Sequence, residues 1–187
     1  SVGEASELIR NGRSDVVITG GVEAVLRDYA IAGFDAMQAI ANEYNDDPEK
    51  ASRPFDANRS GFVFAEGCGI VIVESLAHAL KRGAKIYGEI LGHASSSDAY
   101  HIAALDPEGR GAIRSMKWAL QDAHVNPEDI QYINAHGTST KANDLMETQA
   151  IKQVFNEHAY DLMVNSTKSM IGHALAASGA IEIIACA

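Results

Sequence analysis

The strongest constraint on the fold is a regular alternation of apolar and amphipathic segments in the second half of the chain. Apolar runs typical of strands are followed by segments whose apolar residues recur at helical spacing. The predicted helices cover residues 109–125, 141–157 and 173–187, and the predicted strands cover residues 130–137 and 161–167. Strands and helices that alternate at this spacing predict an α/β fold with a parallel sheet and right-handed crossovers.

The first half of the chain is predicted to be less regular. Residues 1–12 are expected to form a helix, and residues 15–21 a buried strand that runs into a Gly-Gly turn. The remaining expected elements are helices at 33–41 and 75–83, two short strands within 61–75, and a strand at 85–95. No repeat or long linker marks a domain boundary.

Polar side chains follow both predicted strands of the second half. His136 lies at the end of the first strand, and Lys168 and His173 follow the end of the next one. Ligands of open parallel sheets bind at the carboxyl ends of the strands. If the two strands are neighbours, both histidines approach one edge of the sheet, and the sequence then predicts a single site there.

Composition excludes several classes of function. The net charge of −10 argues against nucleic acid as a partner, because phosphate binding needs clustered Lys and Arg. No apolar run approaches the eighteen or so residues that would span a membrane. Cys68 and Cys186 lack metal-ligand spacing, so we expect two structural thiols, buried in apolar surroundings, and a reducing compartment. Neither a metal site nor a nucleotide-binding phosphate loop is expected.

Several motifs resemble those of one enzyme family. The segments 134–140 (NAHGTST) and 166–173 (STKSMIGH) each contain one of the two histidines. Upstream, RPFD at 53–56 and NRSGFV at 58–63 form a third motif, and shorter matches lie at 20–23, 33–37 and 97–101. Together and in this order they resemble the β-ketoacyl synthases, and most closely the type II enzymes that act on acyl carrier protein.

The resemblance implies a reaction and roles for the histidines. These synthases transfer an acyl group to a cysteine, decarboxylate malonyl-carrier protein and join the two by Claisen condensation. Loss of carbon dioxide leaves negative charge on the thioester oxygen, which two imidazole N–H groups would stabilise. His136 and His173 occupy these catalytic positions. His78, His93, His101, His124 and His158 are expected to be structural.

The resemblance also implies supporting residues. Lys168 matches the family's site lysine, which is expected to act with Glu147 in organising the pocket. Asp144 belongs to the same motif as Glu147 and is expected to support it. Thr138 and Thr140 match hydroxyls that hold the pantetheine arm of the carrier protein. No cofactor of the protein's own is implied, because the pantetheine arrives with the substrate.

The family's fold is thiolase-like, with layers in the order α-β-α-β-α, and intact members are homodimers. The chain is expected to be an incomplete piece, with the end of the first repeat at about 1–90 and the start of the second at 91–187. The nucleophilic cysteine would precede Ser1 by a few residues. The fragment alone is therefore expected to be inactive, and the parent protein cytoplasmic, or organellar if eukaryotic.

Alternative functions remain open at this point. A homologue that only decarboxylates malonyl groups or starts chains would need the same histidines. A non-catalytic partner subunit that sets chain length would be expected to lose site residues, whereas His136, Lys168 and His173 are all present. Gln38 lies where some relatives have an arginine thought to meet the carrier protein, so the docking surface is not predicted.

Overall fold

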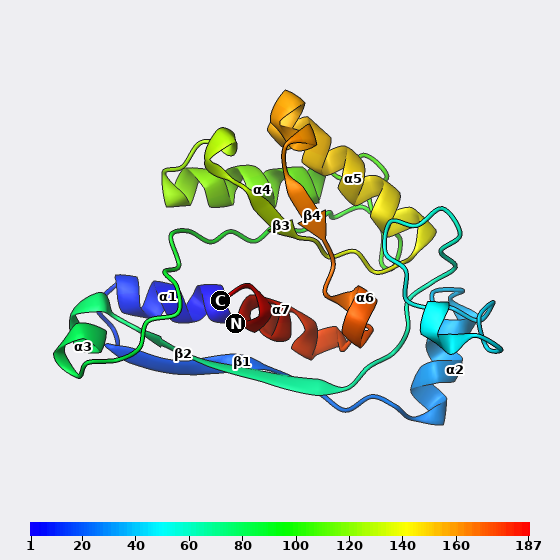
Figure 1. The fold of residues 1–187 in the computed structure, drawn as a ribbon, viewed down its shortest axis with the longest axis horizontal. Helices are drawn as coiled ribbons and strands as arrows, with labels where there is room; N and C mark the ends of the chain where they lie inside the picture. Colours follow the sequence, from blue (N-terminus) through cyan, green and yellow to red (C-terminus); the bar gives the residue numbers. More distant parts are fainter.

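The computed structural model describes residues 1–187 and stacks its elements in four layers (Figure 1). Helices α4 (Arg110–Ala123) and α5 (Lys141–Phe155) form the outer layer on one side, next to strands β3 (Tyr132–Asn134) and β4 (Met163–Asn165). Helices α1 (Val2–Arg10) and α7 (Ser178–Cys186) form the central layer. Strands β1 (Val16–Glu23) and β2 (Gly67–Glu74) form the last one.

The two sheets are built differently. Strands β3 and β4 are parallel, as predicted, and pair Tyr132 with Met163 and Asn134 with Asn165. Strands β1 and β2 form an antiparallel ribbon. Val16 pairs with Glu74 at one end, and Glu23 pairs with Gly67 at the other. The parallel pair is connected through α5, which is the crossover that parallel neighbours require.

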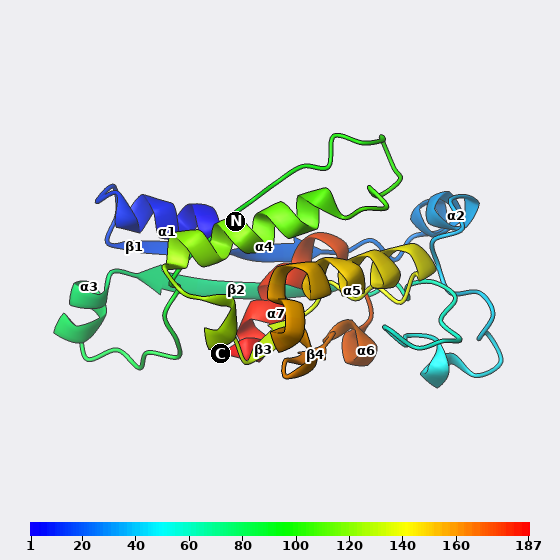
Figure 2. The same cartoon turned by 90° about the horizontal axis from the view of Figure 1, so that it is seen from above.

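Helices α4 and α5 cover the parallel pair and form the main apolar core. Seen from above, both helices lie over the middle of the molecule (Figure 2). The buried members of this core are Ile113, Ala150, Ile151, Val154 and Phe155. Ile113 comes from α4 and the others from the apolar face of α5, so burial of this face orients α5 and the loop before it.

The central helix α7 packs closely on the antiparallel ribbon. A side chain at Gly69 would lie 2.8 Å from the backbone of Ala180 in α7, and one at Gly21 would lie 2.4 Å from the carbonyl oxygen of Ala176, just before the helix. Only glycine allows the helix to approach the strands this closely. The ribbon and α7 therefore form one rigid support beneath the site.

The remaining helical elements are short. They are α2 (Asp28–Ala36), η1 (Pro48–Lys50), α3 (Leu76–Lys81), η2 (Pro127–Asp129), η3 (Asn156–Tyr160), α6 (Lys168–Ile171) and η4 (Leu175–Ala177). The helix expected at 33–41 instead begins at Asp28, where the acidic side chain suits the positive end of the helix dipole. No helix is long and apolar enough to cross a membrane.

Four expectations for strands and cysteines are wrong. Residues 85–95 form no strand because no neighbouring strand pairs with them, and 61–66 contributes only isolated bridges at Phe62 and Phe64. Strand β1 is not buried, since none of its residues is buried and Ile18 is 72% exposed. Cys68 on β2 and Cys186 at the end of α7 are likewise exposed.

Candidate active site

Two histidines meet at the carboxyl ends of β3 and β4. The rings of His136 and His173 lie edge to face, with centroids 5.4 Å apart and an interplanar angle of 85°. His136 follows the end of β3 by two residues, and His173 follows the short helix α6. The prediction that both approach one sheet edge is confirmed, while their chemical role stays a prediction.

Lys168 lies buried beside this pair, with only 1% of its surface exposed. Its Nζ is 3.5 Å from Nδ1 of His136 and 2.5 Å from Oε1 of Glu182 on α7. A buried ammonium needs such a carboxylate, because an isolated charge inside a protein is strongly destabilising. The expected link between Lys168 and Glu147 is therefore corrected: the direct partner of Lys168 is Glu182.

The hydrogen-bond partners of the two rings determine which nitrogen is protonated. Nδ1 of His173 accepts the backbone N–H of Leu175 at 3.2 Å and lies 3.0 Å from Oγ of Ser178. A nitrogen that accepts an N–H carries no proton, so neutral His173 is protonated at Nε2. The ammonium of Lys168 can only donate, which leaves Nε2 of His136 protonated in the same way.

Both imidazoles are neutral at physiological pH. Desolvation is the main cause that lowers the pKa of His136 to about 4, and the charge of Lys168 adds to it, whereas Asp144 acts in the opposite direction. The imidazole of His136 packs against Lys168 and His173, although the residue as a whole is exposed. Desolvation, Lys168 and His136 together lower the pKa of His173 to about 4. The site thus offers two neutral N–H donors.

Glu147 supports the backbone of the first histidine. Its Oε1 accepts the N–H of His136 at 2.6 Å, and its Oε2 accepts the N–H of Gly137 at 2.8 Å. The carboxylate lies two turns into α5 and reaches back to the strand end that precedes the helix. Glu147 thus acts on the position of His136 rather than on Lys168.

Asp144 is buried deeper in the same region, with 1% of its surface exposed. One carboxylate oxygen accepts the backbone N–H of Ser139 at 3.2 Å, and the other accepts that of Phe55 at 2.7 Å. Arg59 lies 3.4 Å away and compensates its charge. Asp144 therefore connects α5, the loop after β3 and the upstream segment of the third motif.

The two threonines predicted to hold pantetheine bond mainly to the protein itself. Their hydroxyl groups lie 2.9 Å apart, and that of Thr140 also accepts the N–H of Asn143 at 3.3 Å as the N-cap of α5. Thr138 is buried. Between them, Ser139 has a left-handed φ of 69° and is fully buried. The sequence pattern of this loop is therefore also needed to start α5.

An aromatic cluster lies against the second histidine. The rings of Phe34, Phe62 and Phe64 pack edge to face at centroid distances of 5.0–5.6 Å. Phe62 contacts His173 in the same manner at 5.1 Å. This cluster, together with Glu182 and Ser178, was not identified from the sequence. Glu182 is the lone charged residue of an apolar helix, which is a signal that could have revealed it.

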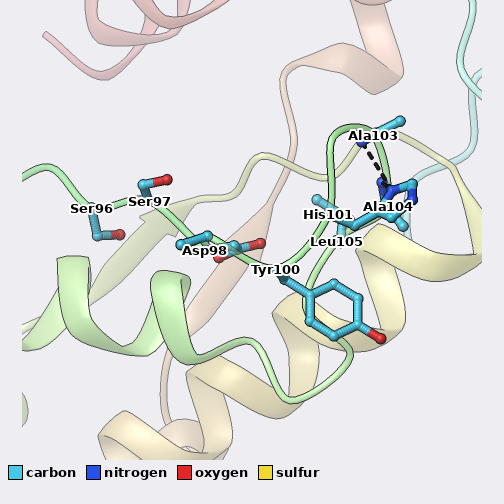
Figure 3. Close-up of a pocket in the computed structure, with 9 residues that line it drawn as sticks. Ser96, Ser97, Asp98, Tyr100, His101, Ala103, Ala104 and Leu105 are labelled. Atoms are coloured by element: carbon cyan, nitrogen blue, oxygen red, sulfur yellow. Dashed lines mark hydrogen bonds between the residues drawn. The ribbon is translucent and has the colours of Figure 1, made fainter.

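A separate surface hollow of about 650 Å³ lies along residues 96–105. Figure 3 shows the side chains of Tyr100 and His101 at this loop. Nδ1 of His101 accepts the backbone N–H groups of Ala103 and Ala104, which gives this histidine a structural role in the turn. Neither histidine of the pair lines the hollow. No group of three His, Cys, Asp or Glu side chains is arranged to hold a metal ion.

Comparison with known families matches nearly the whole chain. Residues 1–79 match the model described as Beta-ketoacyl synthase, N-terminal domain. Residues 87–187 match the model described as Beta-ketoacyl synthase, C-terminal domain. The curated 3-oxoacyl-(acyl-carrier-protein) synthase 2 of Synechocystis is 54% identical over 99% of the chain, which covers 44% of that protein.

Solved structures agree with the sequence matches. The ketosynthase in AntDE:AntF, a type II polyketide complex of an acyl-carrier protein with its ketosynthase bound to the hexaketide, superposes with a TM-score of 0.96 at 46% identity. The match covers 99% of this chain and 45% of that one. The ishigamide ketosynthase/chain length factor gives a TM-score of 0.89 at 41% identity, over 100% and 43% of the two chains. The four layers are thus part of the thiolase-like fold of ketosynthases. This chain spans less than half the length of these relatives.

Proposed function

This chain belongs to the β-ketoacyl synthase family of acyltransferases, and we propose that the full-length protein joins an acyl thioester to malonyl-acyl carrier protein. The reaction is a decarboxylative Claisen condensation in fatty-acid or polyketide elongation. The chain supplies the histidine half of the site, and the nucleophilic cysteine lies outside it. The relatives support this proposal, because they are named as 3-oxoacyl synthases and polyketide ketosynthases.

The observation that carries the proposal is the pair of Nε2–H donors. The rings of His136 and His173 lie 5.4 Å apart, and each uses Nδ1 for a partner inside the protein. In the proposal, one thioester oxygen receives hydrogen bonds from both Nε2 atoms. Donors that are fixed before the reaction stabilise developing negative charge without reorganisation, which is the principle of an oxyanion hole.

The proposed step can be followed bond by bond. The bond between the malonyl carboxylate and the α-carbon breaks, carbon dioxide leaves, and the electron pair remains on the enolate of the thioester. His136 and His173 stabilise the enolate oxygen. The α-carbon then attacks the carbonyl carbon of the acyl group on the cysteine, a carbon–carbon bond forms, and the cysteine thiolate leaves. Because both pKa values lie near 4, the histidines act as neutral hydrogen-bond donors.

The other site residues take supporting roles in this proposal. Lys168 and Glu182 form the ion pair that keeps Nδ1 of His136 engaged. Glu147 and Asp144 hold the backbone of the loop that carries His136. Thr138 and Thr140 remain candidates for contact with the pantetheine arm, provided that their mutual hydrogen bond opens.

Acyl carrier protein is the proposed partner, and a related ketosynthase is described in complex with one. We also propose that the intact protein is dimeric and acts in the cytoplasm, or in an organelle if it is eukaryotic. The two family matches support a division between the N-terminal and C-terminal halves near residue 90.

A second candidate is the non-catalytic partner of such a dimer, since one neighbour is a ketosynthase paired with a chain length factor. Such a subunit has no need for a buried ion pair between a lysine and a glutamate, or for two adjacent imidazoles. The contacts of Lys168 with Glu182 and His136 therefore favour the catalytic subunit. A homologue that decarboxylates without extending chains would need the same donors, so only experiment distinguishes it from an elongating synthase.

The test uses the full-length protein, with malonyl-carrier-protein decarboxylation and chain extension measured separately. His136→Ala and His173→Ala should each lower decarboxylation by about a hundredfold, which is the usual cost of one lost oxyanion donor. Decarboxylation without extension in the wild type would favour the decarboxylase alternative. A folded, dimeric wild type with neither activity would point to the partner subunit.

A further inference from the structure

The segment from Ser52 to Arg59, here called the clamp segment, contacts both the loop that follows His136 and the loop that leads to His173. It belongs to the first half of the chain, whereas both loops belong to the second half. Oγ of Ser52 donates to the carbonyl oxygen of Lys168 at 2.5 Å. The backbone N–H of Arg53 donates to Oγ of Ser139 at 3.1 Å. The clamp segment therefore joins two loops that lie about 30 residues apart in sequence.

Arg59 makes the most extensive contacts of the clamp segment. Its Nε donates to the carbonyl oxygen of Thr140 at 3.1 Å, and its NH2 group donates to that of Lys141 at 2.8 Å. The same Nε lies 3.4 Å from Oδ2 of Asp144. One planar guanidinium thus grips two successive carbonyl groups and a buried carboxylate, which only the fork geometry of arginine permits.

The position of Arg59 is electrostatically unusual. Thr140 and Lys141 begin α5, and a cation near the N-terminus of a helix is unfavourable because the helix dipole is positive there. Asp144 in the first turn of α5 offsets this cost, with its side chain fully buried. Helix stability alone gives no reason to place an arginine here. The arrangement instead fixes the start of α5 against the clamp segment.

The loop between His136 and α5 transmits this constraint. Asp144 holds the N–H of Ser139, whose backbone is fixed in the left-handed region. At Gly137, with a φ of 39°, an added side chain would meet Ser166 at 2.5 Å and the ring of Phe55 at 3.0 Å. The loop is thus packed on both sides, and its two ends are set by Glu147 and by the group around Arg59.

We propose that Arg59 is a positioning residue that acts through Asp144 and the start of α5 to hold His136 in register with His173. This inference rests on the proposed function, because register matters where both imidazoles must reach one oxygen atom. A misplacement of about 1 Å can cost about a hundredfold in rate. Arg59 itself does not touch the reacting atoms in this proposal.

The experiment compares Arg59→Ala with wild type in the full-length protein, with malonyl-carrier-protein decarboxylation as the readout. We expect kcat to fall between about tenfold and a hundredfold while KM changes less than about twofold. Arg59→Lys keeps the charge but cannot span three acceptors, so its kcat should lie between those of wild type and Arg59→Ala. If Arg59→Ala does not fold, Arg59→Lys alone carries the test.

A double-mutant comparison separates positioning from a general structural role. In a His136→Ala background, Arg59→Ala should cost less than about twofold, since the donor that it positions is already absent. Arg10→Ala is the matched control, because it breaks an ion pair between α1 and α4 without touching either loop. In this pair one guanidinium nitrogen of Arg10 lies 2.9 Å from each carboxylate oxygen of Asp122. It should lower thermal stability and leave kcat unchanged.

Either of two results with the Arg59 variants would overturn the inference and leave the proposed function intact. One is a kcat within about twofold of wild type in both Arg59 variants, and the other is full multiplication of the two losses in the double variant. Loss of kcat in Arg10→Ala equal to that in Arg59→Ala would also overturn it. An inactive wild type would instead count against the proposed function itself.

Discussion

The two histidine loops are held by different kinds of bond. The loop of His136 depends on side chains: Glu147 and Asp144 accept its backbone N–H groups, and Ser166 donates to the carbonyl oxygen of Gly137. The loop of His173 depends on the main chain. His173 donates to the carbonyl oxygen of Val63 at 2.7 Å and accepts the N–H of Ala65 at 3.0 Å.

This difference has consequences for substitution. Main-chain bonds survive most changes of side chain, so the position of His173 depends little on residue identity. Side-chain bonds are lost with a single substitution, and a buried N–H that loses its acceptor is costly. His136 is thus the more easily displaced of the two donors. Lys168 is shared by both loops, because it contacts His136 and Glu182 and begins the helix α6 that leads to His173.

The largest expected effect is a loss of stability when the ion pair that serves both loops is broken. Glu182→Ala should lower the free energy of unfolding by about 3–5 kcal/mol, because the buried ammonium of Lys168 loses its partner. Chemical denaturation of the full-length protein measures this loss. The combined variant Lys168→Met with Glu182→Leu should recover much of the stability without recovering activity. Failure of the combined variant to regain stability would contradict an ion-pair origin of the effect.

The next effect should be confined to the His136 loop. Glu147→Ala leaves the N–H groups of His136 and Gly137 without their acceptor, and we expect a stability loss of about 2–3 kcal/mol. Decarboxylation should fall by about a hundredfold as the imidazole moves. Glu147→Gln retains one acceptor oxygen and should show a smaller loss, as measured by steady-state kinetics. Equal losses in both variants would argue against this division of roles between the carboxylate oxygens.

A pH titration tests whether the two loops have comparable environments. Both histidines have a pKa of about 4 in the folded protein against 6.5 when unfolded, so the folded state binds fewer protons between these values. Stability should therefore be complete above pH 6.5 and fall as the pH decreases towards 4. Thermal unfolding of His136→Gln and His173→Gln should show that each substitution removes part of this slope. An unchanged slope in both would disprove the linkage.

The smallest effect is expected on the His173 loop. Ser178→Ala removes one partner of Nδ1, but the N–H of Leu175 still fixes the tautomer. We expect less than about 1 kcal/mol in stability and about a threefold change in rate. Ser166→Ala, the matched change on the His136 loop, should cost more. The reverse order would break the comparison between side-chain and main-chain support.

Much of the second half could be predicted from sequence because local pattern and tertiary packing agree there. Apolar periodicity identified α4 and α5, and the ends of β3 and β4 located His136 and His173. The strand end is a local feature, and the parallel pairing of the two strands follows from the crossover through α5. Geometry of this kind needs no knowledge of individual side-chain contacts.

Long-range partners could not be predicted in the same way. Glu182 on α7 pairs with Lys168, the first residue of α6, and no spacing rule connects residues in two separate helices. The acid at Glu147 was assigned to Lys168, although its place in α5 turns it towards the N–H of His136. The segment 85–95 has the composition of a strand, but a strand forms only where another can pair with it.

The hydrogen bond between Ser52 and Lys168 spans 116 residues, and it has a consequence for synthesis. Contacts of such separation form late, because the entropy of closing a long loop opposes them. A ribosome that has already incorporated His136 must still add Glu182 before Lys168 has its carboxylate, which takes a few seconds at about 5–20 residues per second. Lys168 therefore stays without its carboxylate partner until translation has passed Glu182 on α7.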